Sequence, residues 1–306
     1  LIFSNNSFSL DLDGVDDYLN IPSNNLFNEI ESEMTLSIWI NPSEYSSDFH
    51  PKIFMRTEGY GGGPDRWFLD WSPQHLGNVV NFGGSWPTSA VYGNTSIEIN
   101  TWTHIAVTFD GGYVNIYVNG EHDAEGQVSF EDLSFVQDVP IKIGSATNNS
   151  FFNGKVDDAL IFNRYLDDFE IYELFESGVE EFIEEDELLG YWNFDNSNQE
   201  IAYDLSMHGN DAEIVGAGLY CTGSVDLCGV CNGDNTECEI SDFSINFDGN
   251  GDFIQSGNLD LWDGQFENYN PFTVSFDIKY NGNYDRGEQI FDKGYTYGGN
   301  PSTAQF

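Results

Sequence analysis

The sequence predicts an all-β protein whose antiparallel strands pack as a sandwich. Apolar and polar residues alternate along short segments such as residues 103–109, and this two-residue period is typical of half-buried strands. Clusters of Gly, Asn, Pro and Asp separate these segments at short intervals. The turns Asp110-Gly-Gly and Asn119-Gly readily take the positive φ angles of tight hairpins. Many short antiparallel strands at this spacing favour a sandwich.

The strand candidates can be followed in order along the chain. The first contains Leu10 and Leu12, which alternate with Asp11 and Asp13. The same alternation or a short apolar run marks the later candidates. These are residues 35–40, 52–56, 67–71, 79–82, 103–109, 113–118, 141–143 and 155–162.

One short helix is predicted after the last of these strands, over residues 168–177. Asp167 can cap its free amides and Glu170 stands at the N3 position of a capping box. Gly178 allows the left-handed conformation at which helices commonly end.

The segments that follow the helix are harder to assign to a domain. Residues 180–187 are strongly acidic and are interpreted as a solvated linker, with a longer helix as the alternative. Residues 189–194 form an apolar strand candidate, and residues 204–212 a turn-rich loop. They either close the first sandwich or begin the second.

The beginning of the chain recurs near its end. The matching pairs are residues 7–20 and 242–255, 34–40 and 272–278, 53–56 and 290–293, and 60–64 and 297–301. This spacing is far longer than the repeats of solenoids and predicts tandem globular domains. We therefore expect a complete domain at 1–180, a linker with the unassigned strand at 181–217, a cysteine-rich spacer at 218–241 and a truncated second copy at 242–306. The sequence is expected to be part of a longer protein.

The composition narrows the classes of partner. Nine Lys and Arg stand against 52 Asp and Glu, which gives a formal net charge of −43. Such a charge repels nucleic acid and anionic membranes, so neither is expected as a partner. It favours a saline or cation-rich setting, or serves solubility alone. No apolar run approaches the roughly 20 residues that span a bilayer, so membrane insertion is not expected, and no signal peptide is visible.

Four motifs resemble a known family. They are residues 9–19, 34–40, 101–120 and 152–164, the last followed by the capped helix. In order and spacing they resemble the laminin-G-like, pentraxin-like jelly rolls of the concanavalin A-like superfamily, fully over residues 7–178 and again over 242–306. The resemblance implies a jelly roll of two antiparallel sheets, an extracellular or cell-surface setting, and binding of glycans or glycoproteins, often beside a calcium ion.

Clustered carboxylates supply the candidates for calcium, which prefers about six to eight oxygen ligands near flexible turns. Asp13, Asp16 and Asp17 form one cluster, and Asp157 and Asp158 another. The resemblance implies that the strands carrying the two clusters are neighbours, which would join them. The alternative is that these residues only make turns. In the second copy, Asp248 and Asp252 replace Asp13 and Asp17 as candidates, whereas Gly251 replaces Asp16.

All four cysteines lie close together, at Cys221, Cys228, Cys231 and Cys238. A small segment without a core needs a cross-link, so disulfides are expected, and their pairing is open among three possibilities. Zinc is the alternative, because four thiolates can form a tetrahedral site. The segment also resembles a cysteine element of secreted ADAMTS-type metalloproteases and of bacterial surface repeats. That resemblance implies a spacer between extracellular modules and favours disulfides.

Enzyme motifs are missing from the sequence. There is no Glu-x-Asp-x-x-Glu strand of the related glycoside hydrolases, no His-Glu-x-x-His, no Gly-x-Ser-x-Gly and no phosphate-binding loop. His104 lies in the middle of a predicted strand and is interpreted as structural. We therefore expect no enzymatic activity.

Aromatic residues supply the candidates for glycan contacts. Tyr60 lies in the Gly-rich loop that recurs with Tyr297, and Trp67, Trp71 and Trp86 are nearby, although Trp in a sandwich is often core. The prediction is a non-catalytic adhesion or glycan-binding module of a larger surface or secreted protein, assisted by calcium and flanked by other modules of the same chain. A structural spacer without a ligand, or an accessory module of a hydrolase, are the alternatives.

Overall fold

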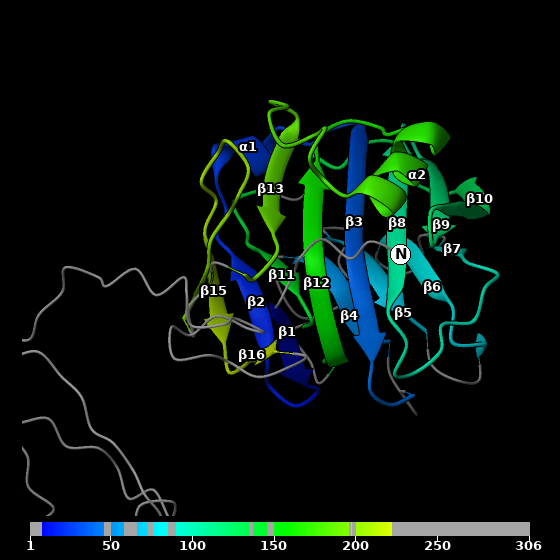
Figure 1. Cartoon of the computed structure of the whole chain (residues 1–306). Coiled ribbons are helices and arrows are strands. Elements are labelled where there is room, and N and C mark those ends of the chain that lie inside the picture. The colour runs from blue at the N-terminus through cyan, green and yellow to red at the C-terminus, as the bar shows by residue number, and fades with distance from the viewer. Residues whose placement is uncertain are drawn as a thin grey trace, which may run out of the picture. The chain divides into compact units, whose positions relative to one another are not determined.

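The computed structural model describes residues 8–45, 50–57, 66–72, 76–84, 90–134, 137–145, 150–195, 197 and 200–221. All of them belong to one unit of the chain. Their strands form two eight-stranded antiparallel sheets that pack face to face (Figure 1). The all-β sandwich predicted from the sequence is therefore confirmed.

The first sheet, sheet A, runs in the order β10-β9-β8-β3-β12-β1-β16, with β13 also paired to β12. Buried and partly accessible residues alternate over the first part of β12, whereas β3, in the middle of the sheet, is buried along almost its whole length. Its strands are β1 (Phe8–Asp13), β3 (Glu33–Pro42), β8 (Thr103–Asp110), β9 (Tyr113–Val118), β10 (Glu121–Gln127), β12 (Asn153–Phe162), β13 (Leu188–Trp192) and β16 (Gly218–Cys221).

The second sheet, sheet B, runs in the order β14-β15-β2-β11-β4-β5-β6-β7. Its strands are β2 (Tyr18–Ile21), β4 (Lys52–Thr57), β5 (Arg66–Trp71), β6 (Val80–Gly84), β7 (Ala90–Tyr92), β11 (Ile141–Ile143), β14 (Ile201–Ala202) and β15 (Ala212–Val215). The three-residue strand β11 was predicted from its two Ile, whereas β7 and β14 were not, and neither was the seven-residue β10, in which only Ala124 is buried.

The inward side chains of the two sheets form one large hydrophobic core. Trp67, Leu69 and Trp71 alternate along β5 and are fully buried there, with Phe82 of β6 beside them. Burying each large apolar side chain contributes about 1.5–3 kcal/mol. The alternating pattern read from the sequence thus corresponds to the inner and outer faces of each sheet.

Both predicted hairpins are present. Gly111 and Gly112 have positive φ angles between β8 and β9, and Asn119 and Gly120 have φ angles of 52° and 77° between β9 and β10. These are the residues that tolerate the left-handed region. The turns place three consecutive strands side by side at one end of sheet A.

Helix α2 (Asp168–Ser177) begins and ends where predicted. The side chain of Asp167 accepts hydrogen bonds from the backbone N–H groups of Phe169 and Glu170, and Glu170 completes the capping box. The helix lies across the outer face of sheet A (Figure 1) and buries Ile171 and Leu174 there in a second hydrophobic cluster. A further single-turn helix, α1 (Asn25–Asn28), was too short to be predicted.

The strands after α2 belong to the first sandwich. β13 pairs with β12, β15 with β2, and β16 with β1. The domain boundary expected at residue 180 is therefore too early, because residues 188–221 complete both sheets. The acidic segment before β13 forms turns rather than a longer helix, and its Glu185 makes a two-pronged contact with the guanidinium of Arg164 at 2.8–3.1 Å.

Several predictions lie outside the described residues. They concern the truncated second copy at 242–306, with Asp248, Asp252 and Tyr297, and the three later cysteines Cys228, Cys231 and Cys238. Among the described helices, neither is long and apolar enough to cross a membrane.

Candidate functional site

The structure corrects the prediction that Trp67 and Trp71 contact a glycan. Trp67 and Trp71 point into the core from β5 and are fully buried, and the indole N–H of Trp71 donates to the backbone oxygen of Asn78 at 2.9 Å. The strand period places these side chains on the inner face, so they offer no surface to a ligand. Tyr60 and Trp86 lie outside the described residues.

The outer face of sheet B instead carries a row of polar residues. Lys52 of β4 is opposite Asp70 of β5, Asp70 is opposite Asn81 of β6, and Asn81 is opposite Tyr92 of β7. We call these four residues the sheet-B row. They share one face because each pair is in direct register across neighbouring strands.

Two members of the sheet-B row are buried although they are polar. Asp70 is 2% exposed and Asn81 is 1% exposed. Lys52 neutralises Asp70, since its Nζ lies 2.7 Å from Oδ1 of the carboxylate, and the same ammonium group lies 4.6 Å from the ring centre of Phe68. His50 approaches the other carboxylate oxygen at 3.7 Å.

The amide of Asn81 has an unsatisfied donor. Its Nδ2 is buried and has no hydrogen-bond partner among the residues that the structure describes. Leaving a buried donor without an acceptor costs about 1–3 kcal/mol, and folded proteins seldom retain such a group without a use for it. An acceptor oxygen from a buried water or from a ligand would satisfy it.

Sequence reasoning missed this row. Asp70 and Asn81 stand at the polar positions of alternating strands, where any outward residue looks the same. Their adjacency follows from strand pairing between β5 and β6, which no local pattern reveals.

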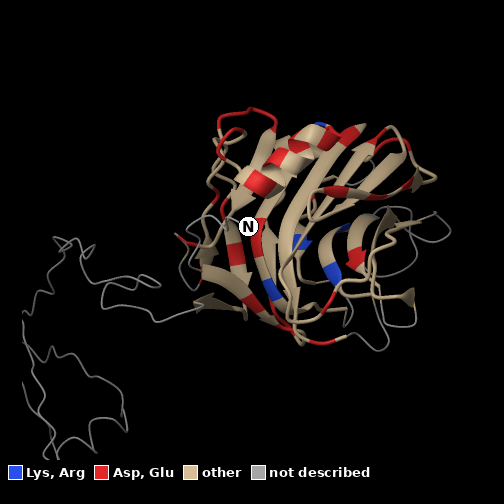
Figure 2. Ribbon diagram, turned by 45° about the vertical axis from the view of Figure 1, so that its right-hand side comes forward, with Lys and Arg blue, Asp and Glu red and all other residues tan. Residues whose placement is uncertain are grey.

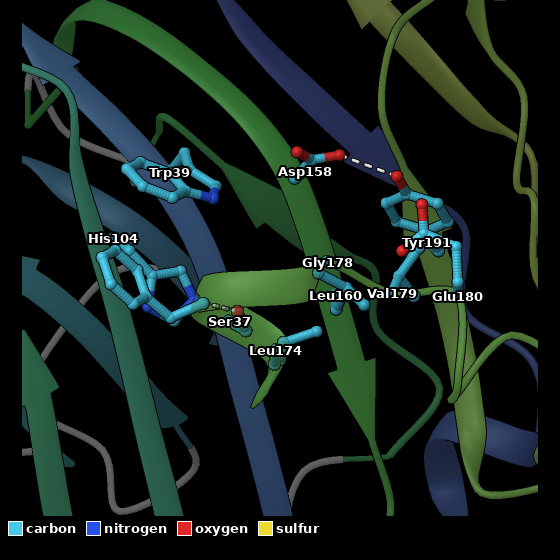
Figure 3. Close-up of a pocket in the computed structure, with 11 residues that line it drawn as sticks. Ser37, Trp39, His104, Asp158, Leu160, Leu174, Gly178, Val179, Glu180 and Tyr191 are labelled. Carbon is cyan, nitrogen blue, oxygen red and sulfur yellow. Dashed lines mark hydrogen bonds between the residues drawn. The ribbon is translucent and has the colours of Figure 1, made fainter. Parts of the chain in front are cut away.

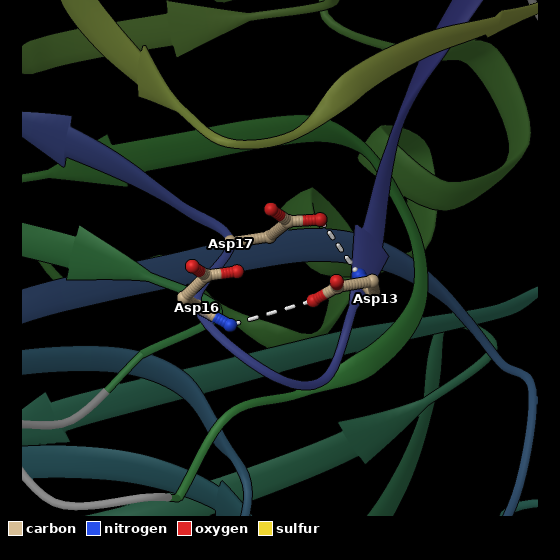
Figure 4. A group of neighbouring side chains, drawn as sticks. All are labelled: Asp13, Asp16 and Asp17. Atoms are coloured by element: carbon tan, nitrogen blue, oxygen red, sulfur yellow. Dashed lines mark hydrogen bonds between the residues drawn. The ribbon is translucent and has the colours of Figure 1, made fainter.

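The predicted carboxylate cluster in the β1–β2 turn does assemble (Figure 4). One carboxylate oxygen from each of Asp13, Asp16 and Asp17 lies within 4.8 Å of the others. The turn holds them: Asp13 Oδ1 accepts from the backbone N–H groups of Val15 at 2.7 Å and Asp16 at 3.4 Å, and Asp17 Oδ2 accepts from that of Asp13 at 2.9 Å. Burial, followed by the charges of Asp13 and Asp16, raises the pKa of Asp17.

The surroundings of the three carboxylates are also compatible with a bound divalent cation. No Lys or Arg of the described segments forms a salt bridge with these three carboxylates. The turn between β15 and β16 approaches closely, since a Cβ on Gly216 would lie 2.2 Å from Oδ1 of Asp17. Only a glycine lets the backbone come this near to the Asp17 carboxylate.

The second predicted carboxylate pair does not join the first. β1 and β12 are neighbours as expected, but their register places Asp13 opposite Asn153, four positions before Asp157. Asp157 and Asp158 lie at a bulge in β12, and Asp158 accepts a hydrogen bond from the hydroxyl of Tyr191 at 2.7 Å. The joint cluster expected from the neighbouring strands is therefore wrong, because strand adjacency does not fix the register.

The charge distribution agrees with the composition (Figure 2). Acidic residues are spread over α2, the turns and the strands, and basic residues are few. Lys52 is thus one of a small number of cations on this surface. Cys221 ends the described part of the chain and is disulfide-bonded.

A family model matches residues 13–172, just over half of the 306 residues. Its description is Laminin_G_3, of the concanavalin A-like lectin/glucanases superfamily. The chain belongs to this family. No curated protein matches it significantly.

Several solved structures resemble this chain at low sequence identity, and one of them has a TM-score above 0.5. A putative carbohydrate binding protein from Bacteroides ovatus ATCC 8483 superposes with a TM-score of 0.53 and 16% identity, over 70% of this chain and 60% of the other. Domain 4 of the extracellular GH43 arabinanase AbnA from Geobacillus stearothermophilus, in complex with arabinotriose, has a TM-score of 0.43 and 20% identity, over 55% and 76%. The pentraxin of Limulus polyphemus has a TM-score of 0.43 and 13% identity, over 56% and 83%. This chain therefore spans about 60% of the first of these proteins.

Proposed function

We propose that this chain is a non-catalytic glycan-binding module of a secreted or cell-surface protein, and that the sheet-B row binds the glycan. The observation that carries the proposal is the buried Asn81 amide, whose Nδ2 lacks an acceptor beside the buried Asp70 carboxylate. Sugar hydroxyls both donate and accept hydrogen bonds, so a sugar oxygen can accept from the Asn81 amide.

The other members of the row suit the same ligand. Lys52 offers a donor that Asp70 already orients, and the ring of Tyr92, 45% exposed, offers an apolar surface at the end of the row. Sites for small polar ligands combine a few oriented polar groups with aromatic surface in this way. The family description, which names lectins and glucanases, and the name of the Bacteroides ovatus protein support a carbohydrate as the ligand.

The number of carboxylates in the sheet-B row supports binding rather than hydrolysis. Glycosidases use two carboxyl groups, about 5–5.5 Å apart in retaining enzymes and farther in inverting ones. The sheet-B row contains one carboxylate, and Lys52 holds it as an ion pair. We therefore propose adhesion or glycan recognition, in a protein whose other modules lie in the same chain.

The glycan proposal is tested on a glycan array and then by calorimetry with the best ligand. Asn81→Ala removes the unsatisfied donor, so we expect at least tenfold weaker binding with an unchanged or higher melting temperature. Asp70→Asn is expected to weaken binding as well. Asn115→Ala, an outward amide on β9 of the other sheet, is the matched control and should bind normally.

Two outcomes would contradict the proposal. If no glycan binds the unaltered protein with calcium present, the chain is better described as a structural spacer. If Asn81→Ala binds as tightly as the unaltered protein, the glycan site lies elsewhere.

A calcium ion at Asp13, Asp16 and Asp17 is the second part of the proposal. When bound, it would supply the positive charge that these three carboxylates lack among the described contacts. The residues would hold it between the β1–β2 turn and the turn that contains Gly216. Its role would be to stabilise the turn by which the chain passes from β1 in sheet A to β2 in sheet B.

The calcium proposal predicts a calcium-dependent melting temperature. A ligand that binds only the folded state adds about 2.7 kcal/mol at a concentration 100 times its Kd. We expect calcium to raise the melting temperature and a chelator to reverse the rise. The double variant Asp13→Asn/Asp17→Asn should show no rise, whereas Asp110→Asn, an exposed carboxylate on β8, should behave normally. A rise of equal size in the double variant would place the ion elsewhere.

A further inference from the structure

A small pocket lies on the outer face of sheet A, where α2 ends (Figure 3). Its volume is about 40 Å³. It is lined by side chains of β3, β8, β12 and β13 and by the residues that follow the helix. The lining residues used below are Ser37, Trp39, His104, Asp158, Glu180 and Tyr191. Because the sheet-B row is on the outer face of the opposite sheet, this pocket is independent of the proposed glycan site.

Aromatic rings form one side of the pocket. Trp39 stacks on Phe175 with ring centres 5.6 Å apart, and its ring lies 5.4 Å from that of His104. Phe175 and Tyr191 also line the pocket. The faces of such rings attract cations.

Two carboxylates line the pocket and no basic side chain does. They are Asp158, which Tyr191 holds by a hydrogen bond of 2.7 Å from its hydroxyl, and Glu180, which is exposed. In Figure 3 the Asp158 carboxylate and the Trp39 ring extend from the neighbouring strands β12 and β3. The pocket therefore has a net negative charge.

His104 adds a neutral acceptor. It is 1% exposed, and burial lowers its pKa to about 3, so the ring is uncharged at neutral pH. Its Nε2 lies 2.8 Å from Ser37 Oγ, whereas its Nδ1 is buried and has no hydrogen-bond partner within the described part of the chain. When Nε2 carries the proton and donates to Ser37, Nδ1 presents a lone pair that a donor can satisfy.

These features select a class of ligand. A water-sized group needs roughly 10–15 Å³ of such space, so 40 Å³ admits an ammonium group with one or two carbon atoms. A quaternary ammonium is larger and has no N–H for Nδ1 of His104. A calcium ion needs about six oxygen ligands, and aromatic rings supply none.

We propose that this pocket binds a primary ammonium group, with Asp158 and Glu180 as counter-charges, Trp39 as an aromatic contact and His104 Nδ1 as a hydrogen-bond acceptor. The negative charge around Asp158 supports binding of an ammonium group. Burial, followed by the negative charge of Asp158, raises the pKa of the adjacent Asp157, and Asp195 adds to the effect. An incoming ammonium ion offsets this repulsion.

The test is a titration of the protein with methylammonium chloride, followed by the ¹⁵N chemical shift of the His104 ring. We expect a saturable change at Nδ1. Sodium chloride at equal ionic strength and tetramethylammonium chloride should not cause it. Two larger amines show where the ammonium group comes from: D-glucosamine represents an amino sugar, and lysine amide a lysine side chain. N-acetylglucosamine and Nε-acetyl-lysine amide, which lack the ammonium group, are their controls.

Variants locate the binding. Asp158→Asn should weaken methylammonium binding at least tenfold. If that variant does not fold, Glu180→Gln gives the same test at an exposed position, with Glu184→Gln in the same acidic turn as its matched control. Equal effects of methylammonium and tetramethylammonium, or equal affinity in Glu180→Gln and Glu184→Gln, would overturn the proposal.

Discussion

At the scale of single residues, Asp157 shows how strand pairing creates an unfavourable charge. The first half of β12 pairs with β1 and the second half with β13, on the same edge. Asp157 and Asp158 occupy the bulge between these halves, where Asp158 has a φ angle of 43°. Burial and the neighbouring carboxylates raise the pKa of Asp157 well above its ordinary value.

This pKa predicts a pH-dependent stability. In the unfolded chain an Asp titrates near pH 3.9, and in the folded protein Asp157 releases its proton at higher pH. Below pH 3.9 both states hold the proton and the residue contributes nothing. As the pH rises through the folded pKa, the folded state loses stability, by about 1.4 kcal/mol for each unit by which the pKa is raised.

The variant Asp157→Asn should remove the loss of stability that the ionisation of Asp157 causes. Its carboxamide oxygen can still accept the hydrogen bond that Oδ1 of Asp157 receives from the backbone N–H of Asp158 at 2.8 Å. We expect urea unfolding to show a higher free energy of unfolding than the unaltered protein at pH 7 and the same value at pH 3. The pH dependence of His104 is common to both proteins and cancels. Lower stability of the variant at pH 7 would show that the negative charge is needed.

Single residues also show which parts of a site a local sequence pattern can predict. Asp13, Asp16 and Asp17 could be predicted as a group because one turn contains them all. Asp70 and Asn81 could not, because eleven positions of chain and a strand pairing separate them.

At the scale of elements, the last strands complete the sandwich. β16 covers the free edge of β1 and β15 covers that of β2. Trp192 of β13 and Phe194 after it are fully buried in the main core. These strands were recognised only in part from the sequence, since β14, β15 and β16 are short.

A truncation series tests this element. Residues 1–241 form one unit and should unfold cooperatively. A chain ending at residue 180 loses Trp192 and Phe194, and removing the side chain of one buried aromatic costs about 3–5 kcal/mol. Because domains have only about 5–15 kcal/mol of stability, we expect the shorter chain not to fold. Equal melting temperatures in circular dichroism would show that residues 188–221 are dispensable.

Helix α2 is the opposite case, because its signals are local. Asp167, Glu170 and Gly178 lie within one short segment, and the helix has the predicted bounds. Its apolar residues do not all face the sheet: Phe169 and Tyr172 are exposed, whereas Ile171 and Leu174 pack on sheet A. Phe169 and Tyr172 are exposed because the helix turns another side toward the sheet, and the sequence of the helix does not encode where the sheet lies.

At the scale of the whole molecule, the charge and the core act against each other. A net charge of −43 favours expansion through repulsion, and the large core between the sheets, together with the cluster under α2, favours compaction. The few cations are used in specific contacts, such as Lys52 with Asp70 and Arg164 with Glu185. Cations from solution would lower the remaining repulsion.

The sequence alone was sufficient for the all-β sandwich, most of its strands, the two hairpins, the capped helix and the carboxylates of the β1–β2 turn. All of these depend on residues close together in the chain, whose spacing reflects backbone geometry. Only the tertiary structure decided that Trp67 and Trp71 are core, that residues 188–221 complete the first domain, that Asp157 is apart from Asp13, and that the sheet-B row and the pocket beside α2 exist. Each of these depends on register and on packing between distant segments, which a local pattern does not specify.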